Sequence, residues 1–446
     1  MPQNFLACDR DQELLLPPSL RDWLGEDHLA WCVLDAVEQI DLSGIYGAYR
    51  ADGWGRAAFD PQMMVALLLY AYAVGERSSR MIERRCHEDV AFRVISANQA
   101  PDHATISRFR ARHEQALAAL FTDVLALCAK AGLVSVGLLA LDGTKIAANA
   151  AMCQSKTYES INAEMKQILD EAAEADAQED EEFGAFLRGD ELPAELSDRR
   201  SRRARLERCK AELEAEHAER EQTFREHMRD RERWEQKAGK KMTGRKPQPP
   251  GQHELTQARL NVTDPDSRVM KDKTALMQGY NAQVIASPEQ VIIAAAITQE
   301  PNDSGQLPPM VAKAAEAIQS AGIGESIGTV VADGGYWSER AVKHVQREGV
   351  AVLVPPFSEA NAAKRKTAKP HSETAKRMHA RLQEPDAVRA HRRRKQIVEP
   401  VFANTKTIRR ADRFMRRGLS ACEAEWQLIA TTHNLLKLWR HRRPTG

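Results

Sequence analysis

Three acidic side chains stand at positions where they could bind metal ions. Asp142 and Asp333 each follow a short apolar run, at residues 138–141 and 327–332, and each is followed by glycine. Glu399 is a single acid within a strongly cationic stretch. Three carboxylates that converge can hold two divalent cations, and all-oxygen ligands suit Mg²⁺ or Mn²⁺ rather than zinc. Two such metal ions activate water or a 3′-hydroxyl for in-line attack on a phosphodiester.

Buried strands are the elements that must position the two aspartates. The run 327–332 is apolar, β-branched and too short for a helix, which predicts a core strand. Gly334 and Gly335 allow a tight turn and a close approach of a ligand after Asp333. By the same reasoning we expect a strand that ends at Asp142. A strand followed by an ordinary Asp-Gly turn is the alternative for each acid taken alone.

Further strand and helix signals surround these two motifs. Residues 278–286 and 290–297 are separated by Ser287-Pro288-Glu289, which predicts a hairpin. Helices are expected at 307–320 and 338–348 and a strand at 351–355, so the pattern indicates an α/β layer built on one sheet. Asn302 and Asp303 read as a helix-capping loop near the strand ends, from which they could support the site.

The carboxyl-terminal part of the chain is basic. Residues 361–446 hold 22 Lys and Arg against 7 Asp and Glu, although the whole chain carries a net charge of only +1. A basic end on a neutral protein favours a polyanionic partner. Cations around Glu399 would hold a phosphate backbone. A solvated basic tail is the alternative, but the segment also shows apolar helical patterning.

Residues 1 to about 135 read as mostly helical. Asp60 and Pro61 fit the N-cap and first position of a helix that is apolar nearly all round. A helix through Met81 to Cys86, a short turn and a helix from Asp102 suit a helix-turn-helix DNA reader, with Arg108, Arg110 and Arg112 outward. A surface helix with ordinary basic side chains is the alternative.

Residues 156–238 are rich in both charge signs and carry few strong hydrophobes. We expect a long exposed helical hairpin, broken near Gly189 to Pro193, and a hinge at 239–251. The chain has no apolar run that could span a membrane, and its start is not a signal peptide. Seven scattered cysteines without a CxxC pair argue against zinc and disulfides and fit a reducing cytoplasm.

The ordered set of motifs resembles the DDE transposases of bacterial insertion sequences, in the group with an InsH-type N-terminal helical domain. Residues 59–61 and 101–110 are similar to that domain. Segments 142–145, 332–337 and 398–402 resemble the three acidic motifs, and 263–268 with 279–283 resemble the segment before the second. In the third motif, many relatives have Tyr, Arg, Glu and Lys where this chain has Arg392, Lys395, Glu399 and Lys406.

The resemblance implies a ribonuclease-H-like catalytic domain, a mixed sheet with flanking helices, at residues 136–155 and 256–446. An all-helical DNA-binding domain would occupy 1–135, and the charged hairpin and linker would form an insertion at 156–255. Asp142, Asp333 and Glu399 would be the catalytic residues and bind two Mg²⁺ or Mn²⁺ ions. The candidates for DNA contact are Lys406, Lys395, Arg392, Arg394, Arg409, Arg410, Tyr336, Trp337, Arg108, Arg110 and Arg112. Tyr336 and Trp337 would stack on a base, with core packing as the alternative.

The implied activity is cleavage and strand transfer at the terminal inverted repeats of the element. Its partners would be double-stranded DNA, at the transposon ends and target, and a second copy of the chain. We expect no membrane, no small-molecule cofactor and a cytoplasmic, nucleoid-associated location. Two alternatives stay open: an inactive DNA-binding regulator derived from a transposase, and a metal-dependent nuclease without strand transfer.

Overall fold

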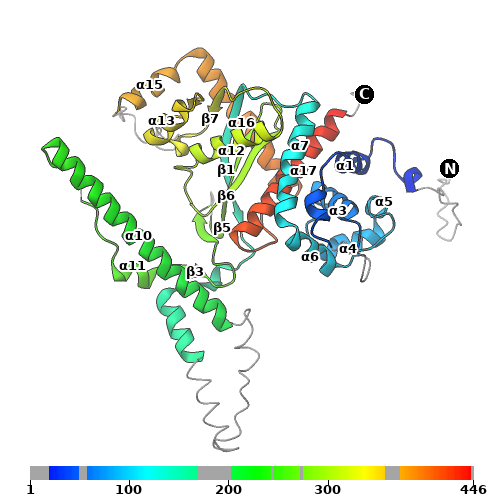
Figure 1. Ribbon diagram of the computed structural model, residues 1–446, viewed down its shortest axis with the longest axis horizontal. Helices are drawn as coiled ribbons and strands as arrows, with labels where there is room; N and C mark the ends of the chain where they lie inside the picture. Colours follow the sequence, from blue (N-terminus) through cyan, green and yellow to red (C-terminus); the bar gives the residue numbers. More distant parts are fainter. Residues whose placement is uncertain are drawn as a thin grey trace, which may run out of the picture.

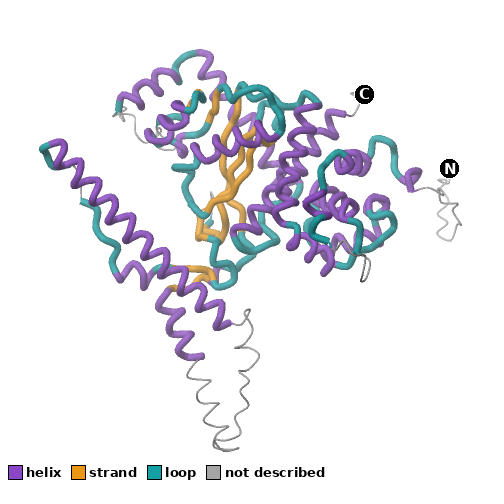
Figure 2. Tube along the Cα trace, in the orientation of Figure 1, coloured by secondary structure: helices purple, strands orange, loops and turns teal. Residues whose placement is uncertain are grey.

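The computed structural model describes residues 20–49, 58–168, 202–242, 246–271, 275–356 and 372–442. A group of N-terminal helices lies beside a central sheet surrounded by further helices, and a helical arm projects away from both (Figure 1). The strands gather in the middle of the molecule, with a short separate pair at the base of the arm (Figure 2). No helix in the described part of the chain is both long and apolar enough to cross a membrane.

The N-terminal region is helical, as the sequence predicts. The elements are η1 (Leu20–Trp23), α1 (Leu29–Glu38), α2 (Ser43–Tyr46), α3 (Pro61–Ala73), α4 (Ser79–Glu88), α5 (Val90–Ile95), α6 (His103–Arg112) and α7 (Glu114–Lys130). Asp60 caps α3 by accepting hydrogen bonds from the backbone of Gln62 and Met63, and nearly every residue of α3 is buried. The expected helix, turn and helix is interrupted by α5, so the α4 and α6 pair contains one helix more than the simple motif.

The central sheet is mixed. Its strands are β1 (Leu138–Ala147), β4 (Arg268–Lys271), β5 (Leu276–Ala286), β6 (Ile292–Thr298), β7 (Thr329–Val331) and β8 (Ala351–Leu353). β5 pairs antiparallel with β1 on one side and with β4 and β6 on the other. β7 is parallel to both β1 and β8. The predicted hairpin around Pro288 is confirmed as the β5–β6 connection, and the mixed α/β class is confirmed with it.

The first strand is longer than predicted, so the expectation that it ends at Asp142 is wrong. β1 continues to Ala147, because β5 pairs with it residue by residue from Ala140 to Ala147. The backbone of Ala147 also bonds to Asp412 and Phe414, which closes the end of the strand. Asp142 therefore lies inside β1 rather than at its end.

The remaining helices of this part are α12 (Leu307–Ser320), η3 (Gly334–Tyr336), α13 (Glu339–Arg347), α15 (Glu373–Arg381), α16 (Pro385–Phe402), the π-helical turn η4 (Ala403–Ile408) and α17 (Leu419–Arg442). Proline is disfavoured inside a helix, yet α16 runs through Pro400. Proline cannot donate to the carbonyl of Gln396. The side chain of Gln290 donates to that carbonyl instead, at 3.2 Å.

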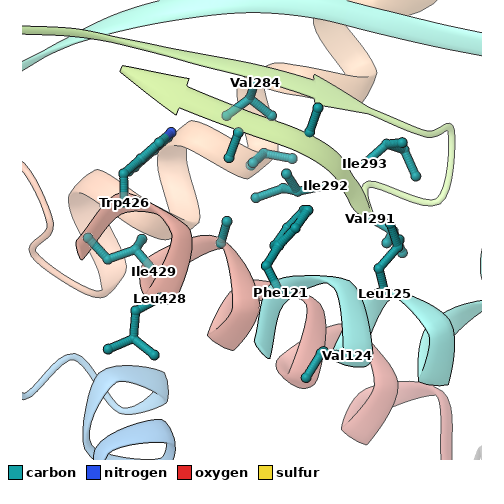
Figure 3. Close-up of a cluster of buried hydrophobic side chains, with 14 of the residues drawn as sticks. Phe121, Val124, Leu125, Val284, Val291, Ile292, Ile293, Trp426, Leu428 and Ile429 are labelled. Atoms are coloured by element: carbon teal, nitrogen blue, oxygen red, sulfur yellow. The ribbon is translucent and has the colours of Figure 1, made fainter. Parts of the chain in front are cut away.

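α17 links the two halves of the molecule. It packs against α7, α3 and α1 on the helical side and against β6 on the sheet side. Figure 3 shows Phe121 of α7 and Trp426 of α17 within one cluster with Val284 and Ile292 of the sheet. One continuous hydrophobic core therefore spans the N-terminal helices and the sheet.

The arm has a small core of its own. It contains η2 (Met152–Gln154), β2 (Ser155–Thr157), a helical stretch at 158–168, α10 (Arg202–Ala238), α11 (Gln252–Gln257) and β3 (Arg259–Asn261). Ile161, Leu206 and Leu260 belong to a cluster separate from the main core. The rest of α10 is mostly exposed and carries several i,i+4 ion pairs, which confirms the expected long charged helix. The predicted break near Gly189 to Pro193 lies outside the described residues.

Candidate active site

The pairing of β1 with β7 brings two of the predicted acids together. Leu138, Leu139 and Ala140 are aligned with Thr329, Val330 and Val331 in a parallel ladder. The same offset along the chain separates Asp142 from Asp333. Neighbouring strands lie about 5 Å apart, and Asp142 and Asp333 each lie two residues past the last pair of this ladder. The charge of Asp333 is among the causes that raise the pKa of Asp142, which agrees with their lying near each other. The fold thus brings together two residues that are remote in sequence.

Asp142 is held between a backbone donor and a cation. Its Oδ1 accepts from the backbone N–H of Gly143 at 2.9 Å, and its Oδ2 accepts from Nη1 of Arg394 at 2.6 Å. Burial nonetheless raises the pKa of Asp142 to about 6, with Arg394 opposing the rise and the charges of Asp333 and Asp303 adding to it. Protonation of this carboxyl is therefore easier than in water.

Arg394 takes an internal role, which corrects its assignment to DNA contact. Its side chain is only 7% exposed, and it forms the ion pair with Asp142 from the buried side of α16. A side chain held this way cannot reach a phosphate backbone in this conformation. Its Nε atom is buried and has no hydrogen-bond partner among the described residues.

Asp333 starts the turn after β7. Its Oδ1 accepts from the backbone N–H of Gly335 at 2.8 Å, so Asp333 caps η3. Tyr336 is fully buried, and its hydroxyl donates to Oε1 of Gln283. Burial and the nearby charges of Asp303, Asp142 and Asp333 raise the pKa of Tyr336 well above its usual value. Tyr336 is therefore a core residue beside the acids and not a stacking platform for a base, while Trp337 is half-buried.

Glu399 is not gathered with the two aspartates in this structure. α16 lies against β1, β5 and β7, where His391 contacts the carbonyl of Ala332 at 3.1 Å and Arg394 binds Asp142. Glu399 lies on the exposed side of the same helix. Within the described ranges, no three His, Cys, Asp or Glu side chains are arranged to hold a metal ion. The donor chemistry, carboxylate oxygen throughout, fits Mg²⁺ or Mn²⁺.

Asp303 is the acid that the sequence interpretation undervalued. It lies in the loop between β6 and α12, and its Oδ1 accepts from Nδ2 of Asn281 and Nε2 of Gln283 at 2.8 and 2.9 Å. Nζ of Lys145 is 3.7 Å away. The available signal was the alternation of Asn281 and Gln283 in a strand, which places both amides on one face.

Lys406 lies beside the same stretch of β1. Its Nζ donates to Oγ1 of Thr144 at 3.1 Å and to the carbonyl of Lys145 at 2.8 Å. Arg392 and Lys395 are exposed on α16, on the side that carries Glu399. Three cations of the third motif therefore lie near the aspartates or on the outward side of α16.

Arg409 is a structural residue, which corrects its assignment to DNA contact. It is 3% exposed and donates to Oγ1 of Thr432 and to the carbonyl of Ile429, at 2.6 and 2.9 Å. Burial lowers the pKa of Arg409 to about 9. Arg410 is exposed, and its carbonyl accepts from Arg77 at 2.6 Å.

The three arginines of α6 differ in their surroundings. Arg108 is exposed, whereas Arg110 is turned inward and donates to the hydroxyl of Tyr72 and the carbonyl of Arg77, at 3.0 and 2.9 Å. The guanidinium of Arg112 stacks on Tyr49 at 4.9 Å. Arg110 thus has an internal role, and Arg108 and Arg112 are the α6 cations on the outer surface.

Two family models match the chain. Residues 18–112 match a transposase domain (DUF772), and residues 233–435 match the transposase DDE domain. The second match includes Asp333 and Glu399 and begins inside α10, after β1 and Asp142. No curated protein and no solved structure matches the chain significantly. The DDE domain is ribonuclease-H-like, and the mixed sheet described above agrees with it.

Proposed function

Since the chain is a DDE transposase of the insertion-sequence type, we propose that it binds the terminal inverted repeats of its own element, cuts the DNA there and joins the freed end to target DNA. The observation that supports this most is the parallel pairing of β1 with β7, which places Asp142 and Asp333 two residues beyond the same end of the ladder. The chain as a whole is thus an enzyme of phosphodiester cleavage and transfer, and the repeat-specific reaction is our proposal.

Asp142, Asp333 and Glu399 are the acids that would hold two divalent cations. Those ions, when bound, supply the activation of water and of the 3′-hydroxyl for attack on phosphorus. The protein's own cations have a separate task. Lys406 beside Thr144, with Arg392 and Lys395 on the exposed side of α16, would orient the DNA backbone next to the aspartates.

We propose that α16 shifts before all three acids meet. Glu399 lies five positions after Arg394, which rotates their directions by about 140°. The two side chains therefore cannot both face Asp142 at once. We propose that the ion pair between Arg394 and Asp142 belongs to the DNA-free enzyme. Binding of DNA phosphate to Arg392 and Lys395 would favour the shift that releases Arg394 and brings Glu399 closer to the aspartates.

The DNA substrate also determines the oligomeric state that we propose. Two transposon ends must be brought together, so a homodimer on DNA is expected. Arg108 and Arg112 on the exposed side of α6 would contribute to recognition of the repeats. The enzyme would act in the bacterial cytoplasm at the nucleoid.

Cleavage of labelled DNA tests the proposal. The substrate is a duplex that carries the inverted repeat found beside the gene, and the variants are Asp333→Asn and Glu399→Gln. We expect the unmodified protein to nick the end in Mg²⁺ and both variants to lose at least a hundredfold in rate while they still bind the duplex. Glu348→Gln is the matched control, because it removes one exposed carboxylate of α13's C-terminal side.

Each other result has a definite meaning. Binding without nicking by the unmodified protein in Mg²⁺ or Mn²⁺ would favour an inactive DNA-binding regulator. Nicking without joining to a target plasmid would favour a nuclease. Full activity of either acid variant would overturn the assignment of that acid.

A further inference from the structure

A fourth carboxylate lies at the same edge of the sheet as the two aspartates. β1 and β6 both pair antiparallel with β5, so β6 runs parallel to β1. The loop after β6 therefore leaves the sheet at the edge where Asp333 follows β7. Asp303 lies in this loop. Its charge is among the causes that raise the pKa of both Asp142 and Tyr336.

Of the two oxygens of the Asp303 carboxylate, Oδ1 accepts side-chain hydrogen bonds and Oδ2 is available to a ligand. Oδ1 accepts from the amides of Asn281 and Gln283, at 2.8 and 2.9 Å. Gln283 in turn accepts from the hydroxyl of buried Tyr336. No described residue donates a hydrogen bond to Oδ2. The side chain is therefore oriented by buried groups while half of its ligand capacity is left free.

Two glycines lie against this carboxylate. A Cβ on Gly335 would lie 2.9 Å from Oδ1 of Asp333 and 3.7 Å from Oδ2 of Asp303, so both carboxylates border the same gap. A Cβ on Gly143 would clash with Nε2 of Gln283 and would lie 2.9 Å from Oδ1 of Asp303 and 3.1 Å from Oδ1 of Asn281. Gly143 therefore lets the polar side chains around Asp303 pack closely against β1, while Gly335 leaves room between the carboxylates of Asp303 and Asp333.

A buried acceptor without a partner lies beside Asp303. Asn281 is fully buried, and its Oδ1 has no hydrogen-bond partner among the described residues. Its orientation follows from its neighbours, since Nδ2 donates to Oδ1 of Asp303 and to the carbonyl of Glu300, both of which only accept. An unsatisfied buried acceptor costs about 1–3 kcal/mol. A cation, or water bound to one, would satisfy it.

We propose that Asp303 is a fourth carboxylate of the catalytic centre, which binds a divalent cation together with Asp333 and with Oδ1 of Asn281, directly or through bound water. Two carboxylates and an amide oxygen form the donor set that Mg²⁺ and Mn²⁺ prefer. In the metal-free protein, Lys145 at 3.7 Å balances the charge of Asp303. This inference rests on the proposed function and adds a ligand to its metal site.

Asp303→Asn separates this role from a purely structural one. Asparagine keeps an oxygen that can accept from Asn281 and Gln283, but it removes the charge and turns the second oxygen into a donor. The matched control is Glu300→Gln, which removes a carboxylate from the same loop at an exposed position. Circular dichroism and thermal unfolding establish that both variants fold.

The experiment measures metal binding and cleavage on the full chain. MnCl₂ is titrated into each protein and free Mn²⁺ is followed by electron paramagnetic resonance. End-DNA cleavage is then measured over a range of MgCl₂. We expect Asp303→Asn to raise the Kd for Mn²⁺ and the Mg²⁺ concentration for half-maximal cleavage at least tenfold, with Glu300→Gln within twofold of the unmodified protein.

The possible failures are distinguishable. If Asp303→Asn binds Mn²⁺ like the unmodified protein while Asp333→Asn does not, Asp303 is not a ligand and the proposed function stands. If the unmodified protein neither binds Mn²⁺ nor cleaves end DNA, the proposed function fails and this inference with it. Fe²⁺ with peroxide adds a direct readout, because backbone scission near Asp303 in the unmodified protein alone would support the assignment.

Discussion

Asp142 lies where opposing charges meet. Arg394 donates to it at 2.6 Å, while Asp333 and Asp303 repel its ionised form and burial withdraws it from water. The balance leaves the pKa of Asp142 at about 6. Arg394 thus replaces part of the positive charge that a metal ion would supply, and metal binding has to compete with it.

The raised pKa predicts how the site responds to acid. An aspartate in an unfolded chain titrates near pH 4, so the contribution of Asp142 to folding stability is present below that pH and is lost as the pH rises through about 6. Metal affinity has the opposite sign, because the ligand must be ionised. We expect the affinity for Mn²⁺ to fall about tenfold for each pH unit below 6, measured by titration between pH 5 and 8.

Arg394→Gln sharpens this prediction. Because Arg394 lowers the pKa of Asp142, its removal should move the midpoint of the acid limb to higher pH, whereas Arg394→Lys keeps the charge and should move it less. A midpoint that stays in place or moves to lower pH in Arg394→Gln would contradict the ion pair as the opposing influence.

At the scale of elements, two glycines in or next to β1 differ in whether they tolerate a side chain. A Cβ on Gly143 would meet Nε2 of Gln283, as well as oxygen atoms of Asp303 and Asn281 at 2.9 and 3.1 Å. These three side chains bond to one another or share acceptors, so none can move alone. A Cβ on Gly137, just before β1, would meet nothing within 4 Å.

We therefore expect Gly143→Ala to lower the free energy of unfolding by about 1–3 kcal/mol, as overpacking does, and to slow end-DNA cleavage at least tenfold. Gly137→Ala should leave both unchanged. Urea denaturation and the cleavage assay measure the two effects. Equal unfolding free energies and cleavage rates in the two variants would show that the side chains around Asp303 move aside for the added methyl group at little cost.

Local chemistry explains which elements the sequence could predict. Asp60 with Pro61 predicts the start of α3, and Pro288 predicts the turn between β5 and β6. Both predictions succeed because each signal lies within a few residues of the structure that it specifies. The length of β1 depends on pairing with β5, which is remote in sequence. The inward positions of Arg394 and Arg110 depend on how whole helices are rotated against their neighbours. Such rotations are tertiary properties that residue type alone does not encode.

The residues of the site also fall into those that local sequence could predict and those that depend on tertiary contacts. The similar apolar runs before Asp142 and Asp333 predicted a shared site, and the two runs do pair as parallel strands, although β1 continues past Asp142. Asp303 looked like a loop residue, because its importance comes from Asn281 and Gln283 on a strand earlier in the chain. Convergence of Glu399 stays a prediction.

At the scale of the whole molecule, the N-terminal helices and the sheet share α17. The core is continuous across them, and a buried ion pair joins them as well. Arg77, 8% exposed, donates to Glu425 of α17 at 2.9 Å and to the carbonyls of Arg413 and Arg410. The Glu425 side chain is fully buried. An N-terminal helical region built this way is expected to unfold together with the sheet.

Arg77→Ala tests this coupling. Removing one partner of a buried pair leaves the other charge without compensation and typically costs about 3–5 kcal/mol, although the backbone donors of Met415 and Arg416 still reach Glu425. Arg84→Ala breaks an exposed pair with Glu88, 63% and 56% exposed, and should cost less than about 1 kcal/mol. Hydrogen exchange in increasing urea would follow peptides of α3 and β5. We expect both to lose protection at the same, lowered urea concentration in Arg77→Ala, because α17 transmits the loss to each side. Early exchange of α3 with unchanged β5 would mean that the helical region unfolds independently and that the shared core contributes little to cooperativity.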